Sequence, residues 1–309
     1  SGGALFGTAE SLQGNIVNNA AVGFDTTSSG TYAGTMSGSG VLAVFGAGTL
    51  ILTGNNTYTG GTAIAGGSVL QLGNGGTTGM IAGNVDIESG GVLAFNRSDN
   101  VSFAGNIGGG GAVAYMGPGI VTLTGVNTYT GGTAIVGGIV QAGSDSVFGT
   151  AGAMLTLAGG TIQATASFST ARPITLAGSG GTFDTNGNAL TLAGAITGTG
   201  ALVKVGAGNL ILSGANDYSG GTTVSGGTLT GTTTSLQGDI TNNSAVVFNQ
   251  TTSGTYAGVM SGTGNLTKTG ARTLILTANN TYTGGTIITG GILQLGNGGT
   301  TGWIAGNVV

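Results

Sequence analysis

Four copies of a polar motif hold most of the residues that could do chemistry. They read NNTYTGGT at 55–62, NTYTGGT at 127–133, NDYSGGT at 216–222 and NNTYTGGT at 279–286. Amide, hydroxyl and phenol groups at this spacing can hydrogen bond to a ligand, and the same residue types also suit a tight turn. The position of this tyrosine motif in the fold decides between a binding site and a structural corner.

Two further stretches have a spacing typical of chemical sites. Asp86 and Glu88 lie two residues apart on an expected strand and so face the same way, as a pair of carboxylates that hydrolyses a glycoside could. Neighbouring coils add only Arg97 and Asp99, so a solvated outer face is the favoured interpretation. The stretch DTNGN at 184–188 resembles half of a calcium loop but lacks the closing Glu, and a turn is favoured there.

The composition excludes several classes of function. The 309 residues include no Cys and no His, which excludes thiol nucleophiles, imidazole bases and most metal sites. The five Lys or Arg residues are scattered, so a nucleic-acid partner is not expected. No apolar run is long enough to span a membrane, and the first ten residues predict no signal peptide. No catalytic residue, metal site or cofactor is predicted.

A long internal repeat divides the chain. Residues 1–67 align with 225–291 at 46 identical positions, and after one deletion 71–85 align with 294–308. The repeat predicts one unit at 1–224 and the start of a second copy at 225–309, as one continuous rod.

A shorter period lies inside the long one. Gly-Gly pairs recur at about one, two or three times 22 residues, and an apolar-rich strand follows each pair. Leu50 and Leu52 share one face of such a strand, and Thr122 stands in another copy where Ile51 stands in the first, so the leucine face is expected to point inward. The pattern predicts an all-β chain that forms a parallel β-helix of about 22 residues per coil. Eight aromatic residues are expected to form core layers: Phe6, Phe24, Phe45, Phe95, Phe103, Phe148, Phe168 and Phe183.

The tyrosine motif has a fixed place in this period. Its coils are 27 residues long, as from Gly40 to Gly67, and the tyrosine falls 18 residues after the opening glycine. A widened corner is predicted, with the ring over the corner and the hydroxyl outward; stacking of sugars on exposed rings is less favoured, because the rings are three or four coils apart. The predicted corner residues are Asn56, Tyr58, Gly60, Gly61, Asn127, Tyr129, Gly131, Gly132, Asn216, Tyr218, Gly220, Gly221, Asn280, Tyr282, Gly284 and Gly285.

The sequence resembles the β-strand repeats of bacterial autotransporter passenger domains. The resemblance lies in ALVKVGAGNLILSGANDYSGGTTVSGGTL at 201–229, GGTFDTNGNALTLAGAITGTG at 180–200, and the copies at 41–67, 112–138 and 265–291. Two copies depart from the pattern, with Val44 and Met116 aligned with Lys204 and Lys268. The resemblance implies a right-handed parallel β-helix that is exported to the bacterial surface within a larger autotransporter or adhesin. The repeat is associated in that family with folding and export, so no catalytic residue carries over.

These observations predict an extracellular structural β-solenoid that serves as a stalk or adhesive shaft and is not an enzyme. Its expected partners are the continuation of its own chain or like subunits through stacked coils, and host-surface or matrix glycans. Two alternatives stay open: a subunit of a secreted filament, and a β-helix that binds or cleaves polysaccharide.

Overall fold

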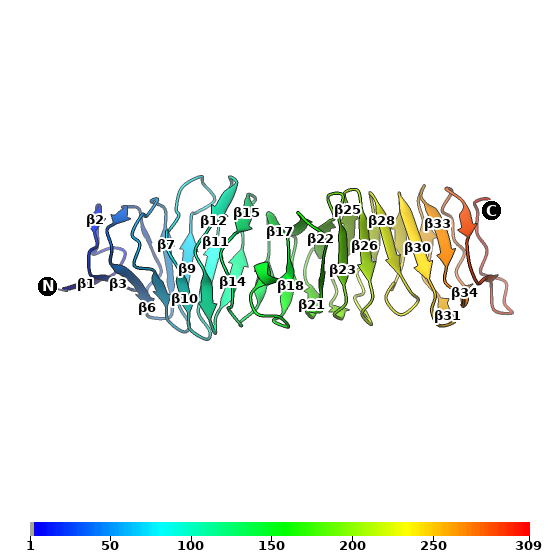
Figure 1. Cartoon of the computed structure of the whole chain (residues 1–309), viewed down its shortest axis with the longest axis horizontal. Helices are drawn as coiled ribbons and strands as arrows, with labels where there is room; N and C mark the ends of the chain where they lie inside the picture. The colour runs from blue at the N-terminus through cyan, green and yellow to red at the C-terminus, as the bar shows by residue number, and fades with distance from the viewer. Residues whose placement is uncertain (1–2) are drawn as a thin grey trace. The chain divides into compact units, whose positions relative to one another are not determined.

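The computed structural model describes residues 3–309, in two compact units at Ser1–Thr156 and Leu157–Val309. Short parallel strands stack coil upon coil in each unit, with about 15 turns in the two units together (Figure 1). The predicted all-β parallel solenoid is therefore confirmed. One 3₁₀ turn, η1 (Asp145–Phe148), is the only helical element in residues 3–309. Within that part of the chain, no helix has the length and apolar character needed to cross a membrane.

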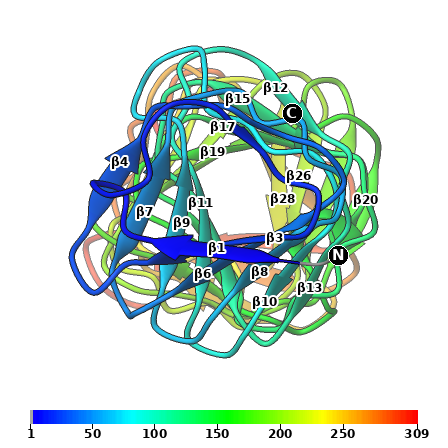
Figure 2. The ribbon, with the colours of Figure 1, turned by 90° about the vertical axis from the view of Figure 1, so that its left-hand side faces the viewer.

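Three parallel sheets and one strand pair build unit 1. Figure 2 shows β1, β3, β6 and β8 along one side of this unit, β7, β9 and β11 along a second, and β12, β15 and β17 along a third. In stacking order, the first sheet is β1 (Ala4–Gly7), β3 (Ala21–Asp25), β6 (Val41–Phe45), β8 (Thr62–Ile64), β10 (Val85–Ile87) and β13 (Ile107–Gly109). The second is β4 (Gly30–Tyr32), β7 (Thr49–Leu52), β9 (Val69–Leu72), β11 (Val92–Phe95), β14 (Ala112–Tyr115) and β16 (Thr133–Ile135). The third is β12 (Val101–Phe103), β15 (Ile120–Leu123) and β17 (Ile139–Ala142), and the pair is β2 (Ile16–Val17) with β5 (Met36–Ser37).

Unit 2 is built in the same way from strands of two to five residues. One sheet is β19 (Thr161–Ala164), β22 (Gly181–Asp184), β25 (Leu202–Val205), β27 (Thr222–Val224), β29 (Ile240–Asn242) and β32 (Met260–Ser261). Another is β20 (Phe168–Thr170), β23 (Ala189–Leu192), β26 (Asn209–Leu212), β28 (Thr228–Gly231), β30 (Ala245–Asn249), β33 (Asn265–Thr269) and β35 (Thr286–Ile288). The others are β21 (Ile174–Leu176) with β24 (Ile196–Thr197), and β31 (Gly254–Tyr256), β34 (Thr273–Leu276) and β36 (Ile292–Leu295); β18 (Leu155–Leu157) contains the boundary of the units.

The strand register shows the true size of a coil. Leu50 pairs with Leu70, Leu70 with Leu93, and Leu93 with Val113, which gives steps of 20, 23 and 20 residues. Coils of roughly 20 residues replace the predicted mean of 22. Because the stacking keeps like residues in register, a leucine in one coil meets an aliphatic residue in the next.

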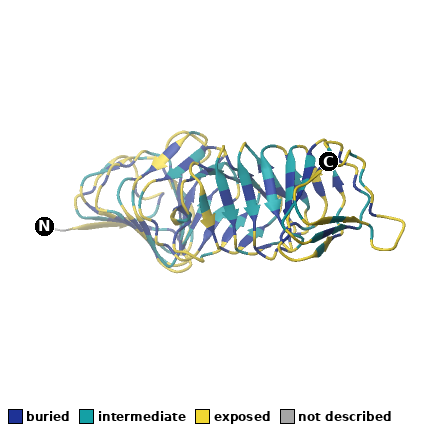
Figure 3. Cartoon of the chain, turned by 45° about the vertical axis from the view of Figure 1, so that its right-hand side comes forward, coloured by how far each residue is buried: buried dark blue, intermediate teal, exposed yellow. Residues whose placement is uncertain are grey.

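Alternate residues along each strand face the interior, as the period of two predicts. Leu50 and Leu52 are fully buried, whereas Thr49, Ile51 and Thr122 are half-buried on the outer face (Figure 3). The predicted inward face of these strands is confirmed. Each fully buried leucine contributes roughly 1.5–3 kcal/mol by leaving water.

The predicted phenylalanine layers are right in part. Phe24, Phe95, Phe103, Phe148 and Phe183 are at most 2% exposed. The prediction was wrong for Phe6, which is 63% exposed, and Phe45 and Phe168 are only half-buried.

The register explains why Phe6 lies outside. It pairs with Gly23 at an outward position of the sheet, where its ring contacts that of Phe45 at 6.1 Å between centroids. The missing side chain of Gly23 leaves the space that the Phe6 ring covers.

Candidate functional site

The four tyrosines of the motif point into the protein. Tyr58, Tyr129, Tyr218 and Tyr282 are at most 1% exposed, which corrects the expectation that their hydroxyl groups face outward. Each hydroxyl hydrogen bonds to the threonine four residues later, at 2.6, 2.7, 2.7 and 2.5 Å. Burial raises the pKa of Tyr58, Tyr218 and Tyr282. Because a buried ring cannot stack on a sugar, these tyrosines are not a carbohydrate platform.

The second asparagine of the motif joins its coil to both neighbours. Asn56 Oδ1 accepts the Met36 N–H at 2.8 Å from the preceding coil, and Asn56 Nδ2 donates to the Met80 carbonyl at 3.0 Å in the following coil. Asn216 bonds in the same two directions, to Ile196 N at 2.8 Å and to the Ser235 carbonyl at 2.7 Å. The side chain thus acts as a clamp between three successive coils.

The remaining two copies keep this clamp to different degrees. Asn280 Oδ1 accepts the Met260 N–H at 2.9 Å, and its Nδ2 approaches the Trp303 carbonyl at 3.5 Å. Asn127 Nδ2 approaches the Val147 carbonyl at 3.4 Å, but its buried Oδ1 has no hydrogen-bond partner. The copy at 127–133 is therefore the weakest clamp of the four.

The two glycines of the motif are needed for different reasons. A Cβ on Gly60 would lie 2.5 Å from the carbonyl oxygen of Gly40 in the preceding coil, so only glycine permits this close approach of two backbones. Gly61 has φ +91°, in the region that disfavours other residues. The same division between close approach and positive φ holds for Gly131 and Gly132, Gly220 and Gly221, and Gly284 and Gly285.

Two lysines, which the sequence analysis treated as scattered cations, are fully buried. Lys204 Nζ donates to the carbonyls of Val205, Gly206 and Gly226 at 2.8, 2.8 and 2.9 Å. Burial lowers the pKa of Lys204 to about 8, and the Asp184 carboxylate opposes this shift.

Lys268 has the same arrangement. Its Nζ donates to the carbonyls of Thr269, Gly270 and Gly290 at 2.5, 2.8 and 3.0 Å, and burial lowers its pKa. Each ammonium group thus ties the turn after its strand to the next coil.

The residue that replaces lysine in the copy at 112–138 is Tyr115, not Met116. The carbonyls of Val44, Tyr115, Lys204 and Lys268 each accept the N–H of the residue 21 positions later, which identifies them as equivalent. Tyr115 is 2% exposed and Met116 is 47% exposed. The alignment from the sequence was one residue out of register at this point.

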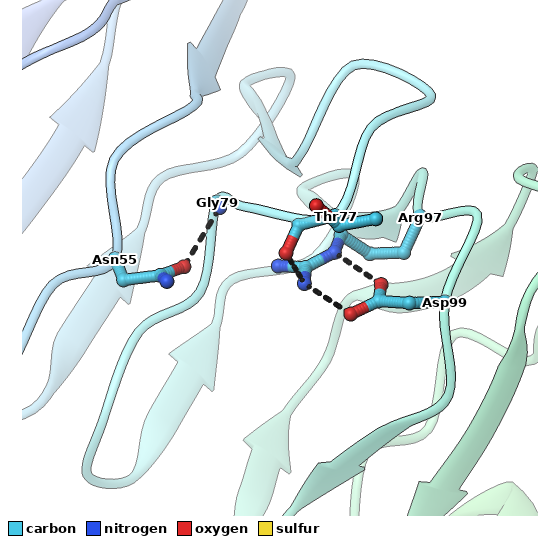
Figure 4. Close-up of polar contacts among 5 residues, drawn as sticks. All are labelled: Asn55, Thr77, Gly79, Arg97 and Asp99. Carbon is cyan, nitrogen blue, oxygen red and sulfur yellow. Dashed lines mark hydrogen bonds and ion pairs between the residues drawn. The ribbon is translucent and has the colours of Figure 1, made fainter.

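A loop at 73–79 is held by side chains of two other coils. Asn55 Oδ1 accepts the Gly79 N–H at 2.9 Å, and Arg97 Nη2 donates to the Thr77 carbonyl (Figure 4). Arg97 also bonds to Asp99 at 2.9 and 3.0 Å, and this bond lowers the pKa of Asp99. Arg97 is only 4% exposed, so the pair pins the loop from beneath.

The carboxylates Asp86 and Glu88 are both exposed. Glu88 Oε2 accepts the Gly66 N–H at 3.1 Å, whereas Asp86 lines an open groove of about 470 Å³. Only one of the two carboxylates therefore belongs to this groove.

The stretch at 184–188 forms a turn. Asn186 and Gly187 have φ +46° and +85°, and the two Asp184 oxygens accept from Asn186 N and Gln163 Nε2. In residues 3–309 no three acidic side chains are grouped to hold a metal ion.

Stacked parallel coils with buried clamps and no assembled catalytic group define a parallel β-solenoid of repeat type. Four stretches, at 42–72, 116–142, 202–234 and 266–295, match the passenger-associated-transport-repeat family, and each contains one tyrosine motif. The chain thus carries passenger-associated transport repeats.

A curated relative agrees with this assignment. The "Adhesin BmaC autotransporter" of Brucella suis biovar 1 (strain 1330) is 45% identical over 154 residues, which are 48% of this chain. The chain spans 4% of the length of that relative. Together the repeats and this relative support an autotransporter passenger domain. No solved structure matches the chain significantly.

Proposed function

We propose that this chain is a passenger segment held outside a bacterial cell, where it acts as a stalk or adhesive shaft. The two-way clamp of the tyrosine motif carries the proposal. Asn56 and Asn216 each tie a coil to the coils before and after it, so a pull along the stack is shared by side-chain bonds as well as by the strand ladders. The passenger repeats and the relative named as an adhesin support the same role.

The proposal assigns no chemical reaction to the chain. Asp86 stands alone in its groove, and no Lys or Arg lines that groove to complete an acid–base pair. Hydrolysis of a glycoside normally uses two carboxylates across the bond.

A tandem array of the long unit is part of the proposal. The same side-chain bonds recur 224 residues apart: Tyr32 to the Gly14 carbonyl at 2.7 Å, and Tyr256 to the Gly238 carbonyl at 2.6 Å. In such an array, the residues that follow 309 in the parent gene resemble DIESGGVLAFNRSDN at 86–100. An unrelated continuation would contradict the array.

Intact bacteria test the surface role. Antibodies against residues 1–309 are expected to label unpermeabilised cells, and deletion of this segment from the parent protein is expected to reduce attachment to host cells or matrix. If the purified chain also blocks attachment, the segment is adhesive; if it does not block, the segment is a stalk. Absence of labelling, or full attachment by the deletion strain, would overturn the proposal.

A further inference from the structure

The groove that contains Asp86 lies on the outer face of the sheet β6-β8-β10-β13 in unit 1. Its floor is the outward row Ala63, Asp86 and Gly108, which pair in register in adjacent strands. Two of these residues have little or no side chain, so a ligand can approach the backbone of the sheet closely.

Two tyrosine motifs form the walls of this groove. Gly60 and Gly61 come from the motif at 55–62, and Thr128 comes from the motif at 127–133. The motif coils are 27 residues long, whereas the 44 residues from Gly67 to Gly111 supply two shorter coils between them. Longer corners on both sides of shorter ones produce the hollow.

The rim of the groove presents hydrogen-bonding groups from successive coils. Asn84 Oδ1 accepts the Asn106 N–H at 3.0 Å, and Asn106 Oδ1 accepts the Val126 N–H at 2.7 Å. These bonds fix both side chains and occupy their oxygens, which leaves the Nδ2 groups as donors. The exposed Asp86 carboxylate adds an acceptor, and the exposed Thr128 hydroxyl can donate or accept.

We propose that this groove binds a neutral glycan chain that lies along the stacking direction of the coils. Sugar hydroxyls both donate and accept, as the amides, the carboxylate and the hydroxyl of the groove require. Val41 and Ala63 offer apolar surface to the C–H face of a sugar ring. The four strands β6, β8, β10 and β13 cover roughly 14 Å at the usual strand spacing, which suits a short oligosaccharide. The inference rests on the adhesive form of the proposed function and specifies its ligand.

The same features exclude other ligands. No cation lines the groove and Asp86 is negative, so acidic sugars would be repelled. A peptide that adds a strand to the sheet is excluded as well, because β8 and β10 are already paired on both edges.

Binding at one groove is expected to be weak. No aromatic side chain lines the groove, so the affinity depends on hydrogen bonds exchanged with water. Many copies of the segment on one cell would raise the avidity without any new contact.

Saturation-transfer NMR on the purified 309-residue chain tests the proposal. The probes are neutral hexasaccharides of glucose, mannose and galactose, a polyuronate hexasaccharide and a chitosan hexasaccharide. We expect saturable binding of at least one neutral probe and none of the polyuronate. Binding of no neutral probe, or of chitosan alone, would overturn the inference while leaving the stalk function intact.

Three substitutions locate the site. Gly108→Leu fills the groove, and the fold tolerates its Cβ, which would lie 3.4 Å from Thr128 Oγ1 and 3.8 Å from Asp86 Oδ1; binding is expected to disappear. Asp86→Asn removes the charged acceptor and is expected to weaken binding about tenfold. Glu88→Gln, just past the end of the same strand and outside the groove, is the matched control and should leave affinity unchanged. Unaltered binding in Gly108→Leu, or an equal loss in Glu88→Gln, contradicts the assignment.

Discussion

The coils at 40–67 and 264–291 have the same sequence pattern but bury different groups at one position. Both hold a Tyr–Thr hydrogen bond, at 2.6 Å for Tyr58 and 2.5 Å for Tyr282. At the end of the preceding strand, the first coil buries Val44 and the second buries Lys268, each at most 1% exposed. One backbone thus accommodates either an aliphatic side chain or an ammonium ion.

The difference shows which contacts fix the coil and which are local solutions. The carbonyls of Val44 and Lys268 bond to the next coil in the same way, so the strand ladder does not depend on the side chain. The lysine is tolerated because three turn carbonyls surround its Nζ within 3.0 Å. A buried charge without such partners would cost several kcal/mol.

The largest effect is expected from a charge in the shared core. Leu50→Asp and Leu274→Asp place a carboxylate at equivalent fully buried positions that have no donors, and each should lower the free energy of unfolding by more than about 4 kcal/mol or prevent folding. Thr122→Asp, on the outer face, is the control and should be mild. Thermal unfolding followed by circular dichroism measures the three; equal effects at Leu50 and Thr122 would contradict the assigned faces.

Lys268→Met tests the lysine solution itself. It leaves the carbonyls of Thr269, Gly270 and Gly290 without their donor, and a loss of roughly 1–3 kcal/mol in the free energy of unfolding is expected. Val44→Met, in the coil that never had the ammonium, should cost less than about 1.5 kcal/mol. Denaturant titration compares the two variants, and similar losses would mean that the ammonium contributes only its volume.

The tyrosine hydroxyl should matter equally in both coils. Tyr58→Phe and Tyr282→Phe each remove one buried hydrogen bond to threonine, and each should cost about 1–1.5 kcal/mol. In the double variant Tyr58→Phe with Thr62→Val neither partner is left unpaired, so its loss should be smaller than the sum of the two single losses. Strict additivity in this cycle would show that the two groups do not interact.

The smallest effect concerns pH. With the folded pKa of Lys204 at about 8 and an unfolded value of about 10.4, the unfolded chain binds more protons than the folded chain between these values. The free energy of unfolding should therefore rise from pH 8 to about 9.5. Above about pH 10 it should fall, because the buried tyrosines keep protons that unfolded tyrosines lose.

Lys204→Met is the control for this pH dependence. The rise should be smaller in this variant but still present, since the pKa of Lys268 is lowered as well. A wild-type free energy of unfolding that falls between pH 8 and 9.5 would contradict the lowered values.

The architecture of the coils was predictable because their pattern is local. Alternation of apolar residues along TLIL assigned Leu50 and Leu52 to the interior, and the repeated Gly-Gly pairs gave the coil period within about two residues. The interior position of Lys204 was visible in the same way, since it alternates with buried Leu202 along β25. Charge alone suggested a surface residue, and only the fold brings carbonyls of two coils to its Nζ.

The polar details were harder to predict because they depend on contacts between coils. A threonine follows every Gly-Gly of the tyrosine motif, and this regularity is the signal that could have identified the partner of the buried hydroxyl. The groove gave no such signal, because its walls come from two motifs that are about 70 residues apart in the sequence.

The close approach of Gly60 to Gly40 has a consequence for how the chain folds. Each motif corner rests on a backbone formed 20 residues earlier, so a coil can close only on a predecessor that is already in place. Closing a loop of that length costs roughly 2.7 kcal/mol in chain entropy, and every coil pays it separately. Growth in one direction, one coil at a time, spares the chain any longer search, and a thread that emerges gradually through a narrow opening can order itself as fast as it appears.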